Sequence, residues 1–396
     1  MRGHYVDLVW AADPTLYAPP KYKRACNYRV FIPDPIQQLA LTLPGDLAGV
    51  VSSAENAIAA LNRSAGSELA PLARLLLRTE SVASSKVEGM QIDARQLARA
   101  EANQDAGRNV GREALEILAN IDAMQLAIER AAETADIRPS DLIDVHRVLL
   151  ASAPNSGIAG RVRNRQNWIG GNNYNPCGAS FVPPPAGEVT RLMADLCRFV
   201  NDATLPPLVQ AAVAHAQFET IHPFDDGNGR TGRALVQIIL RRRHLAPSFV
   251  PPISVILARD KDAYVGGLTA YREGDLEKWI EHFCVATAQA AQLAERYSFK
   301  VRALQERWRN QLSKTSSPPR KDAAAWALIT ILPAYPMLTV PVGVAATGRT
   351  KPAIANAITE LEAARVLTRA NESVRNRVWE ADGLIDLITS LDAGEG

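Results

Sequence analysis

Residues 222–240 constrain the fold of this chain more than any other stretch. The run Ala234–Leu240 is apolar and free of helix breakers, and it follows the polar, glycine-containing segment HPFDDGNGRTGR. This pattern predicts a loop that leads directly into a helix. The first backbone N–H groups of a helix have no partner within the helix, so they form a place where anions bind well.

Arg230 and Arg233 add positive charge where a helix already has its positive end. The two residues are three apart, so their side chains share one face of the first turn. Each cation there costs about 0.3 kcal/mol or more against the helix dipole. The arrangement becomes favourable if a strongly anionic group lies over it, and phosphate is the obvious candidate.

Length and composition narrow the class of protein. At 396 residues the chain is too long for one hydrophobic core, so two or three domains are expected. An apolar content of 47% and a charged content of 22% are typical of a soluble globular protein. The net charge of +2 neither favours nor excludes a nucleic acid as a partner.

The cysteines and the N-terminus bear on the compartment. The four cysteines are Cys26, Cys177, Cys197 and Cys284. They contain no C-x-x-C pair, so we expect neither a disulfide framework nor a zinc site, and a reducing cytoplasm fits best. The N-terminus lacks a basic region followed by an apolar core, and no apolar run is long enough to span a bilayer. We therefore expect no signal peptide and no membrane partner.

Residues 1–110 are expected to form an N-terminal arm followed by helices. Residues 1–46 are rich in proline, which predicts an extended and irregular arm. Helices are expected at 47–61 and 67–88, and Gly89 is suited to cap the second one.

The end of this second helix, SSKVEG, carries an oddly placed acid. Ser84 and Glu88 are four residues apart and therefore face the same way. Glu88 stands at the negative end of the helix dipole, which is mildly unfavourable. One interpretation is a solvated glutamate before a capping glycine. The other is that Glu88 meets Arg230 and Arg233 in the fold, where the misplaced acid and the misplaced cations would relieve one another.

Residues 111–312 are predicted to be helical with one interruption. The expected helices lie at 111–132, 140–151, 188–201, 208–220, 261–271 and 276–308. Residues 160–185 contain short β-forming runs around the sequence GGNN, which predicts a small β-hairpin. Its edge could accept an extended peptide as an added strand, and a loop without function is an equal alternative.

Residues 313–322 have the composition of a linker, and residues 323–396 are predicted to form a winged helix-turn-helix. Its expected helices span 323–332, 340–347 and 351–364, and its strands span 366–369 and 376–380 around a tip at 371–373. The basic and amide residues of its expected recognition helix and wing are Arg349, Lys351, Asn356, Arg375 and Arg377. Nearby glutamates dilute this basic character, so DNA binding and protein docking or dimerisation both stay open.

The stretch at 222–233 has the residues that phosphate chemistry needs. Gly227 and Gly229 would let backbone N–H groups approach a phosphate closely. Asp226 offers a carboxylate to Mg²⁺, which binds through one or two carboxylates plus substrate phosphates. His222, with an ordinary pKa of about 6.5, is a natural general base for a hydroxyl. The spacing fits neither a P-loop, an EF-hand nor a zinc site.

By these residues the chain resembles the Fic-domain proteins. His222–Arg233 matches their motif H-P-F-x-D-G-N-G-R-x-x-R without a departure. Ser84–Gly89 resembles the inhibitory motif Ser/Thr-x-x-x-Glu-Gly/Asn of the class II members, placed ahead of the core. Residues 160–185 resemble the flap hairpin, and residues 261–279 the region that closes the adenine pocket. The resemblance implies an all-α fold, with a Fic-type helical core, a small β-hairpin flap and a C-terminal winged helix-turn-helix, as in bacterial members.

The activity that this resemblance implies is protein AMPylation. A protein adenylyltransferase moves AMP from ATP to a Ser, Thr or Tyr hydroxyl of a target protein, or of itself. By resemblance, His222 deprotonates the hydroxyl, and Asp226 holds Mg²⁺ (or Mn²⁺) between the α- and β-phosphates. The residues implied to bind ATP are Gly227, Asn228, Gly229, Arg230 at the β-phosphate, Arg233 at the γ-phosphate and Tyr264 near the adenine. The residues implied to hold the target segment are Trp168, Ile169 and Gly170 of the flap, while Phe224 is expected to be a core anchor.

The resemblance also implies self-inhibition. Glu88, on a helix with Ser84, would pair with Arg233 and occupy the position of the γ-phosphate. Two alternatives stay open. One is different chemistry on the same fold, either removal of AMP with Glu88 orienting a water, or transfer of another phosphate-containing group. The other is a nucleotide-sensing regulator that binds DNA through the winged helix, and a homodimer is open in either case.

Overall fold

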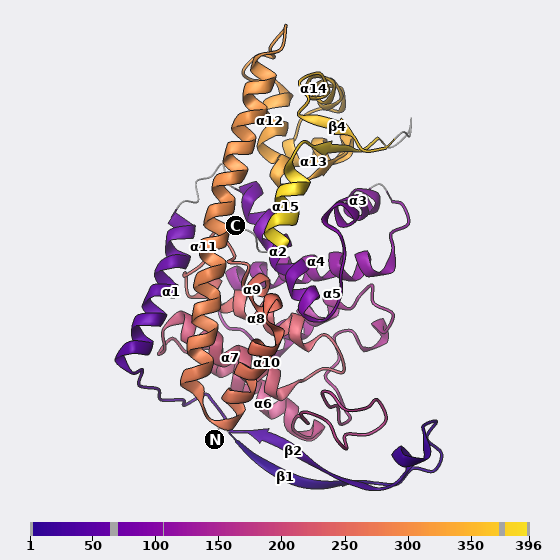
Figure 1. Cartoon of the computed structure of the whole chain (residues 1–396), viewed down its shortest axis with the longest axis vertical. Helices are drawn as coiled ribbons and strands as arrows, with labels where there is room; N and C mark the ends of the chain where they lie inside the picture. The colour runs from indigo at the N-terminus through magenta and orange to yellow at the C-terminus, as the bar shows by residue number, and fades with distance from the viewer. Residues whose placement is uncertain (1–2, 64–69, 106, 372–376, 394–396) are drawn as a thin grey trace. The chain divides into compact units, whose positions relative to one another are not determined.

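The structure is a computed structural model that describes residues 3–63, 70–105, 107–371 and 377–393. It is mostly helical (Figure 1). The helices are α1 Gly45–Arg63, α2 Ala70–Val87, α3 Ala94–Asp105, α4 Arg112–Glu133, α5 Pro139–Leu149, α6 Ala186–Asn201, α7 Pro207–Ile221, α8 Asn228–Arg242, α9 Ile253–Arg259, α10 Lys261–Glu273, α11 Leu276–Ser313, α12 Ala324–Ile331, α13 Val340–Thr347, α14 Lys351–Ala363 and α15 Leu384–Asp392. The strands are β1 Gly3–Trp10, β2 Cys26–Pro33, β3 Met337–Leu338, β4 Leu367–Arg369 and β5 Trp379–Ala381. None of the described helices combines the length and the apolar character that crossing a membrane requires.

The helices expected from apolar periodicity are present, with ends within a few residues of the prediction. Helices α3, α9 and α15 were not expected. Residues 67–69 of the expected second helix lie outside the described residues, and so do Glu372, Ser373 and Arg375 of the expected wing.

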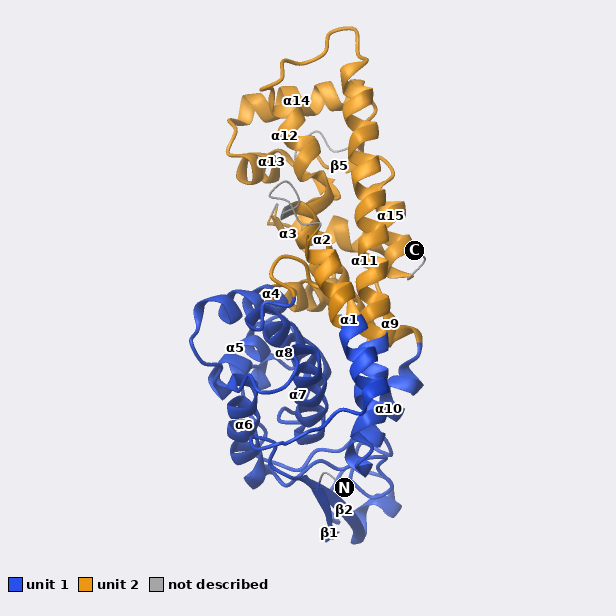
Figure 2. Ribbon diagram, turned by 90° about the vertical axis from the view of Figure 1, so that its left-hand side faces the viewer, with its two compact units in different colours: residues 1–54, 123–245, 260–285 blue, residues 55–122, 246–259, 286–396 orange. Residues whose placement is uncertain are grey.

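The chain forms two compact units (Figure 2). The first comprises residues 1–54, 123–245 and 260–285, and the second comprises residues 55–122, 246–259 and 286–396. Helices α5 to α8 and α10 belong to the first unit, together with β1 and β2. Helix α2, which precedes Glu88, belongs to the second unit, together with α12 to α15.

Helices α7 and α8 are the centre of the first unit. Residues 208–221 of α7 and residues 228–240 of α8 are all buried. Gly232 lets the two helices approach closely, since a Cβ atom there would lie 2.6 Å from Glu219 Oε1 and 3.0 Å from a ring carbon of Phe218. The apolar run that predicted this helix therefore lies within the core.

The expectation of an irregular N-terminal arm is wrong. Strands β1 and β2 pair in antiparallel register along eight residues each, from Gly3 opposite Pro33 to Trp10 opposite Cys26. The prolines between the strands lie in the connection at 11–25, so the strands keep their ladder hydrogen bonds. Their aromatic and β-branched residues favour this conformation.

The hairpin expected at 160–185 is limited to a single β-bridge between Ile169 and Phe181. The N–H of Ile169 donates to the carbonyl of Phe181 at 2.8 Å, and the N–H of Ser180 donates to the carbonyl of Ile169 at 2.8 Å. The expectation of no disulfide is also wrong, because Cys26 and Cys177 are joined. They are 151 residues apart in sequence, so no short spacing pointed to the bond.

In the second unit, α2 packs against α9, η4 (Leu332–Ala334) and α15. The buried carboxylate of Glu80 on α2 accepts hydrogen bonds from the N–H of Ser254 at 2.8 Å and from its hydroxyl at 2.6 Å. These bonds satisfy the start of α9, whose first N–H groups have no partner within the helix. Strands β3, β5 and β4 form a small antiparallel sheet in that order beside α12 to α14.

The disulfide predicts a clear pattern of cysteine reactivity. A peptide map of unreduced protein should contain Cys26 and Cys177 in one cross-linked species. Cys197 and Cys284 are buried and lie outside the disulfide, and burial raises the pKa of Cys197 to about 12. Iodoacetamide at neutral pH should therefore leave both unmodified in the folded protein and alkylate them after unfolding. Alkylation of Cys26 and Cys177 without a reductant would contradict the assigned bond.

Candidate active site

A six-residue loop joins the two central helices of the first unit. It begins at His222, which ends α7 with left-handed backbone (φ 49°) and donates its N–H to the carbonyl of Phe218 at 2.9 Å. It closes at Gly227, whose φ of 75° is one that glycine adopts easily, and α8 starts at Asn228. The expected general base and the expected phosphate-binding helix terminus therefore lie at the two ends of one short loop.

The side chain of Asn228 closes this loop. Its Oδ1 accepts from the N–H of Phe224 at 2.9 Å, and its Nδ2 donates to the carbonyl of Phe224 at 2.8 Å. Phe224 is fully buried, as expected of a core anchor. The amide of Asn228 thus organises the loop, and its contact with phosphate stays a prediction.

His146 on α5 contacts the loop through its ring. This residue was not identified from the sequence. Its ring stacks on Phe224 with centroids 3.8 Å apart and planes 2° apart. The N–H of Gly160 donates to Nδ1 at 3.0 Å, so Nδ1 carries no proton, and Nε2 donates to the carbonyl of Asp226 at 3.0 Å. Burial lowers the pKa of His146 to about 4, in agreement with a neutral ring that has one donor and one acceptor.

Arg163 holds the other side of the loop and was also missed. It is 3% exposed and donates to four backbone carbonyls. Nε donates to His222 at 2.8 Å, Nη1 to Arg165 at 3.1 Å, and Nη2 to Pro184 at 2.6 Å and Ile221 at 3.3 Å. Burial lowers its pKa to about 10, so it stays charged at neutral pH. Asn167 adds a hydrogen bond from Nδ2 to the carbonyl of Phe224 at 2.9 Å.

Asp226 has an exposed carboxylate, and each of its oxygens accepts one hydrogen bond. Its Oδ1 accepts from the N–H of Gly227 at 2.6 Å, and its Oδ2 accepts from Nδ2 of Asn155 at 2.8 Å. The side chain is 51% exposed, so lone pairs on both oxygens stay accessible. The described residues contain no group of three or more His, Cys, Asp or Glu side chains that could hold a metal. One carboxylate suffices for Mg²⁺ when substrate phosphates supply further oxygens.

Arg230 and Arg233 lie in the first two turns of α8, and each is 2% exposed. Nη2 of Arg230 is 3.8 Å from Oδ1 of Asp226. Burying guanidinium groups is costly unless anionic or hydrogen-bonding groups surround them. Both guanidinium groups lie near the N-terminal end of one helix, where the helix dipole is positive.

Tyr264, expected near the adenine, is buried, whereas the expected flap residues lie in the segment at 168–170. Tyr264 is 4% exposed, and its hydroxyl is 2.8 Å from Nε2 of the buried His215, so its ring has little surface to offer an adenine. In the flap segment, Nε1 of Trp168 donates to the carbonyl of Asn172 at 2.6 Å, Ile169 is exposed, and Gly170 has a left-handed backbone.

Ser84 and Glu88 belong to the second unit. Ser84 is fully buried on α2, whereas Glu88 is exposed just after the helix ends. Gly89 follows with φ 89° and donates its N–H to the carbonyl of Lys86, which confirms it as the helix cap.

A cavity of about 530 Å³ lies beside the loop in the first unit. Its aromatic lining residues come from β1 and from the flap segment, and they are Trp10, Trp168 and Tyr174. Asp225 of the loop and Arg165 also line it, with Nε of Arg165 3.3 Å from Oδ1 of Asp225. The cavity thus has aromatic walls and a charged pair, and one member of that pair, Asp225, belongs to the same loop as His222.

Two segments of the chain match one protein family. Residues 136–240 match the Fic/DOC family, and residues 49–129 match the Fic/DOC family N-terminal region. The first segment contains the whole loop between α7 and α8, with Arg230 and Arg233. The second segment contains α2 and Glu88.

Similar proteins include the protein adenylyltransferase Fic of Drosophila yakuba, which is 31% identical over 182 residues. These residues make up 45% of this chain and 33% of that protein. The protein adenylyltransferase fic-1 of Caenorhabditis elegans is 29% identical over 153 residues, or 38% of this chain and 27% of that protein. The match therefore spans about a third or less of the length of these relatives.

Solved structures share the fold at low sequence identity. A Fic family protein from Desulfovibrio desulfuricans G20 has a TM-score of 0.54 at 23% identity, over 87% of this chain and 98% of that chain. A fragment of Fic-1 from C. elegans has a TM-score of 0.50 at 21% identity, over 64% of this chain and 73% of that chain. Residues 136–240 of this chain thus form a segment of the Fic/DOC family, and residues 49–129 form the N-terminal segment of that family.

Proposed function

We propose that this chain is a protein adenylyltransferase, which transfers AMP from ATP to a hydroxyl side chain of a target protein. The observation that carries the proposal is the loop at 222–227, which links His222 to the N-terminus of α8. A base for a hydroxyl and a binding place for phosphate are thereby held at a fixed spacing. The relatives named protein adenylyltransferases support the same activity.

The proposed reaction uses groups on both sides of the loop. The imidazole of His222 accepts the proton of the target hydroxyl, and the hydroxyl oxygen attacks the α-phosphorus of ATP. A new P–O bond forms while the bond from the α-phosphorus to the bridging oxygen breaks, and pyrophosphate leaves with that electron pair. The N–H groups at the start of α8, with Arg230 and Arg233, stabilise the charge on the phosphates.

Asp226 is the residue that we propose to hold Mg²⁺ or Mn²⁺. Its exposed carboxylate and the lack of a closed cage of ligands around it suit an ion that shares its coordination with ATP. When bound, such an ion neutralises part of the phosphate charge.

The target segment is proposed to bind along residues 168–170. Ile169 is exposed, and the cavity lined by Trp10, Trp168 and Tyr174 offers room for a neighbouring side chain of the target. Main-chain pairing would supply affinity, and the cavity would supply selectivity.

Glu88 is proposed to inhibit the enzyme by pairing with Arg233, with Ser84 on the same helix. A carboxylate on Arg233 would compete with the terminal phosphate of ATP, because both are anions that seek one guanidinium. The place of Glu88 directly after the last residue of α2 supports the proposal, because the capped helix fixes where this side chain begins.

Residues 323–393 are proposed to form a winged helix-turn-helix that docks protein. The order α12, β3, α13, α14, β4, β5 supports the fold. Lys351 and Arg377 line a cavity of about 550 Å³ together with Asp105 and Glu362. Such mixed charge suits a protein partner better than a phosphate backbone.

The substitution Glu88→Gly tests the inhibited state. With ATP labelled at the α-phosphate, we expect protein labelling to rise roughly tenfold or more, since a charge-assisted contact is lost. Glu88→Gln should act in the same direction, which separates the charge from any effect of glycine on the end of α2. No gain in either variant would contradict the inhibitory role.

His222→Ala in the Glu88→Gly background should abolish the labelling. Label from the γ-phosphate should not be incorporated in any variant, because pyrophosphate leaves. Transfer that survives His222→Ala would overturn the assigned base, and γ-label in protein would indicate phosphorylation instead.

His146 makes the stability of the loop depend on pH. Its pKa is about 4 in the folded chain and about 6.5 in an unfolded one. Between pH 6.5 and pH 4 the unfolded chain therefore binds a proton at His146 that the folded chain does not bind. The free energy of unfolding falls as the pH is lowered through this range. The loss is on the order of 3 kcal/mol.

We expect thermal unfolding temperatures to fall with pH over this range, and to fall less steeply in His146→Gln. Asp392 acts in the opposite sense, because burial raises its pKa to about 6, so it stabilises the fold as pH drops. Both proteins contain Asp392, and its contribution cancels in the comparison. Equal slopes in the two proteins would contradict the role of His146.

A further inference from the structure

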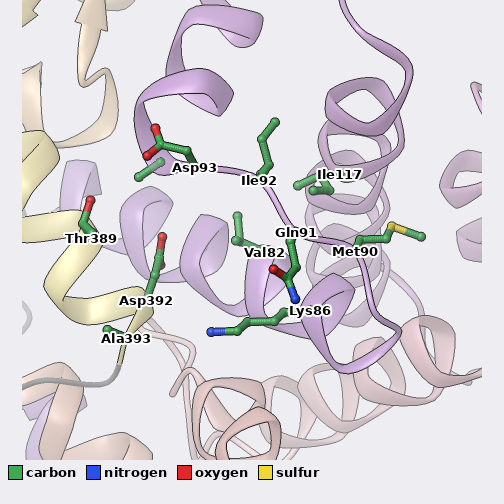
Figure 3. Close-up of a pocket in the computed structure, with 11 residues that line it drawn as sticks. Val82, Lys86, Met90, Gln91, Ile92, Asp93, Ile117, Thr389, Asp392 and Ala393 are labelled. Atoms are coloured by element: carbon green, nitrogen blue, oxygen red, sulfur yellow. The ribbon is translucent and has the colours of Figure 1, made fainter.

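A second cavity lies within the second unit, at the end of the helix that precedes Glu88 (Figure 3). It has a volume of about 360 Å³ and lies among the last turns of α2, the α2–α3 connection and the end of α15. This volume is within the range of small-molecule sites. Nothing in the proposed transfer reaction uses this cavity.

One side of the cavity is apolar. Val82, Met90, Ile92 and Ile117 line it. Ile117 is part of a buried cluster between α3 and α4, and the other three pack against that cluster. This wall is therefore fixed by the core beneath it, and it suits an aliphatic or aromatic group of a ligand.

The other side carries one basic side chain, Lys86, and two carboxylates, Asp93 and Asp392. Lys86, two residues before Glu88, is exposed with its side chain directed toward the α15 side of the cavity, and Asp392 is the last residue of α15 (Figure 3). Oδ1 of Asp392 is buried and accepts no hydrogen bond from any described residue. Burial raises the pKa of Asp392, while the charges of Arg78 and Lys86 lower it, so Lys86 acts on it through space. Among the described residues, the two groups form no ion pair with each other.

We propose that this cavity binds a small zwitterion with an apolar side chain, of the α-amino acid class. The ligand carboxylate would pair with Lys86, its ammonium group would donate to the carboxylate of Asp392, and its side chain would pack on the wall at Val82 and Ile117. Each charged group of such a ligand meets a group of opposite charge, because one cation and two carboxylates line the cavity.

Occupation of the cavity would act on the inhibitory helix, an inference that rests on the proposed function. The ligand bridges Lys86 on α2 and Asp392 on α15, two helices that already pack together. Such a bridge stabilises the last turn of α2 and keeps Glu88 in its inhibitory position. The bound ligand therefore lowers AMP transfer.

Binding is tested by isothermal titration of the full-length protein with L-leucine and L-phenylalanine. Leucinamide lacks the carboxylate, and N-acetyl-L-leucine lacks the ammonium group. We expect each of these analogues to bind roughly tenfold or more weakly than leucine, because each loses one charge-assisted contact. The absence of heat for both amino acids at millimolar concentration, or equal affinity for the analogues, would overturn the site.

The variants assign the two contacts. Lys86→Met keeps the aliphatic stem and should bind leucine as weakly as leucinamide. Asp392→Asn should bind leucine as weakly as N-acetyl-L-leucine. Lys300→Met, an exposed lysine on α11 that does not line the cavity, is the matched control and should bind leucine like the parent. Unchanged leucine affinity in Lys86→Met would contradict the proposed orientation.

The regulatory effect is measured separately from binding. Leucine should lower α-phosphate labelling in the protein with Glu88 and leave labelling in Glu88→Gly unchanged. Equal inhibition of both proteins would contradict an action through Glu88. If no variant transfers AMP, the proposed function fails, while the titration still decides whether the site exists.

Discussion

The two hydrogen bonds between the amide of Asn228 and the backbone of Phe224 are the constraint on which the candidate site depends. A chain that leaves one buried helix and enters another within six residues must bury backbone groups that no helix satisfies. Each such group left unpaired costs about 1–3 kcal/mol. Asn228 satisfies one donor and one acceptor with a single side chain, because its amide offers both kinds of atom. The tight turn that joins His222 to the start of α8 is stable for this reason.

Other buried backbone carbonyls of the loop also need hydrogen-bond donors. Side chains from distant parts of the sequence supply them. His146 reaches the carbonyl of Asp226 from α5, and Arg163 reaches the carbonyl of His222 from the segment that leads to the flap. A neutral imidazole and a charged guanidinium serve the same purpose, as each donates to a buried carbonyl. The side chain of His222, the proposed general base, is thus attached to a backbone that is held from several directions.

Much of this arrangement could be predicted from the sequence, and the rest could not, for physical reasons. The helices with long apolar stripes, such as α4 and α6, follow from a period of 3.6 residues, which is a local property. Helix α9 has only seven residues, too few to show a period, and four of the five buried residues of α3 are alanines, which give a weak apolar signal. His146 lies in a helix with no motif around it, and Arg163 looks like one of several basic residues at 161–165. Their roles arise only when the fold brings them to the loop.

The prediction of an irregular arm at residues 1–46 was wrong for a related reason. Prolines near residues 14–20 and 33–35 suggested irregular chain, yet they lie between the strands and at the end of β2. The proline content of the first 46 residues is an average, and it hides the two eight-residue runs that form β1 and β2. The partner of Cys26 was equally hidden, since pairing over 151 residues is a property of the tertiary structure.

The bond between Cys26 and Cys177 has a topological consequence. It closes residues 26–177 into a covalent ring, which contains α1 to α5 and with them the whole family segment 49–129. A single proteolytic cut anywhere inside that ring opens it without releasing a fragment. The helix that ends before Glu88 and the loop that contains His222 would therefore stay parts of one molecule after such a cut, and only a second cut within the ring, or one outside it, could separate a piece of the chain.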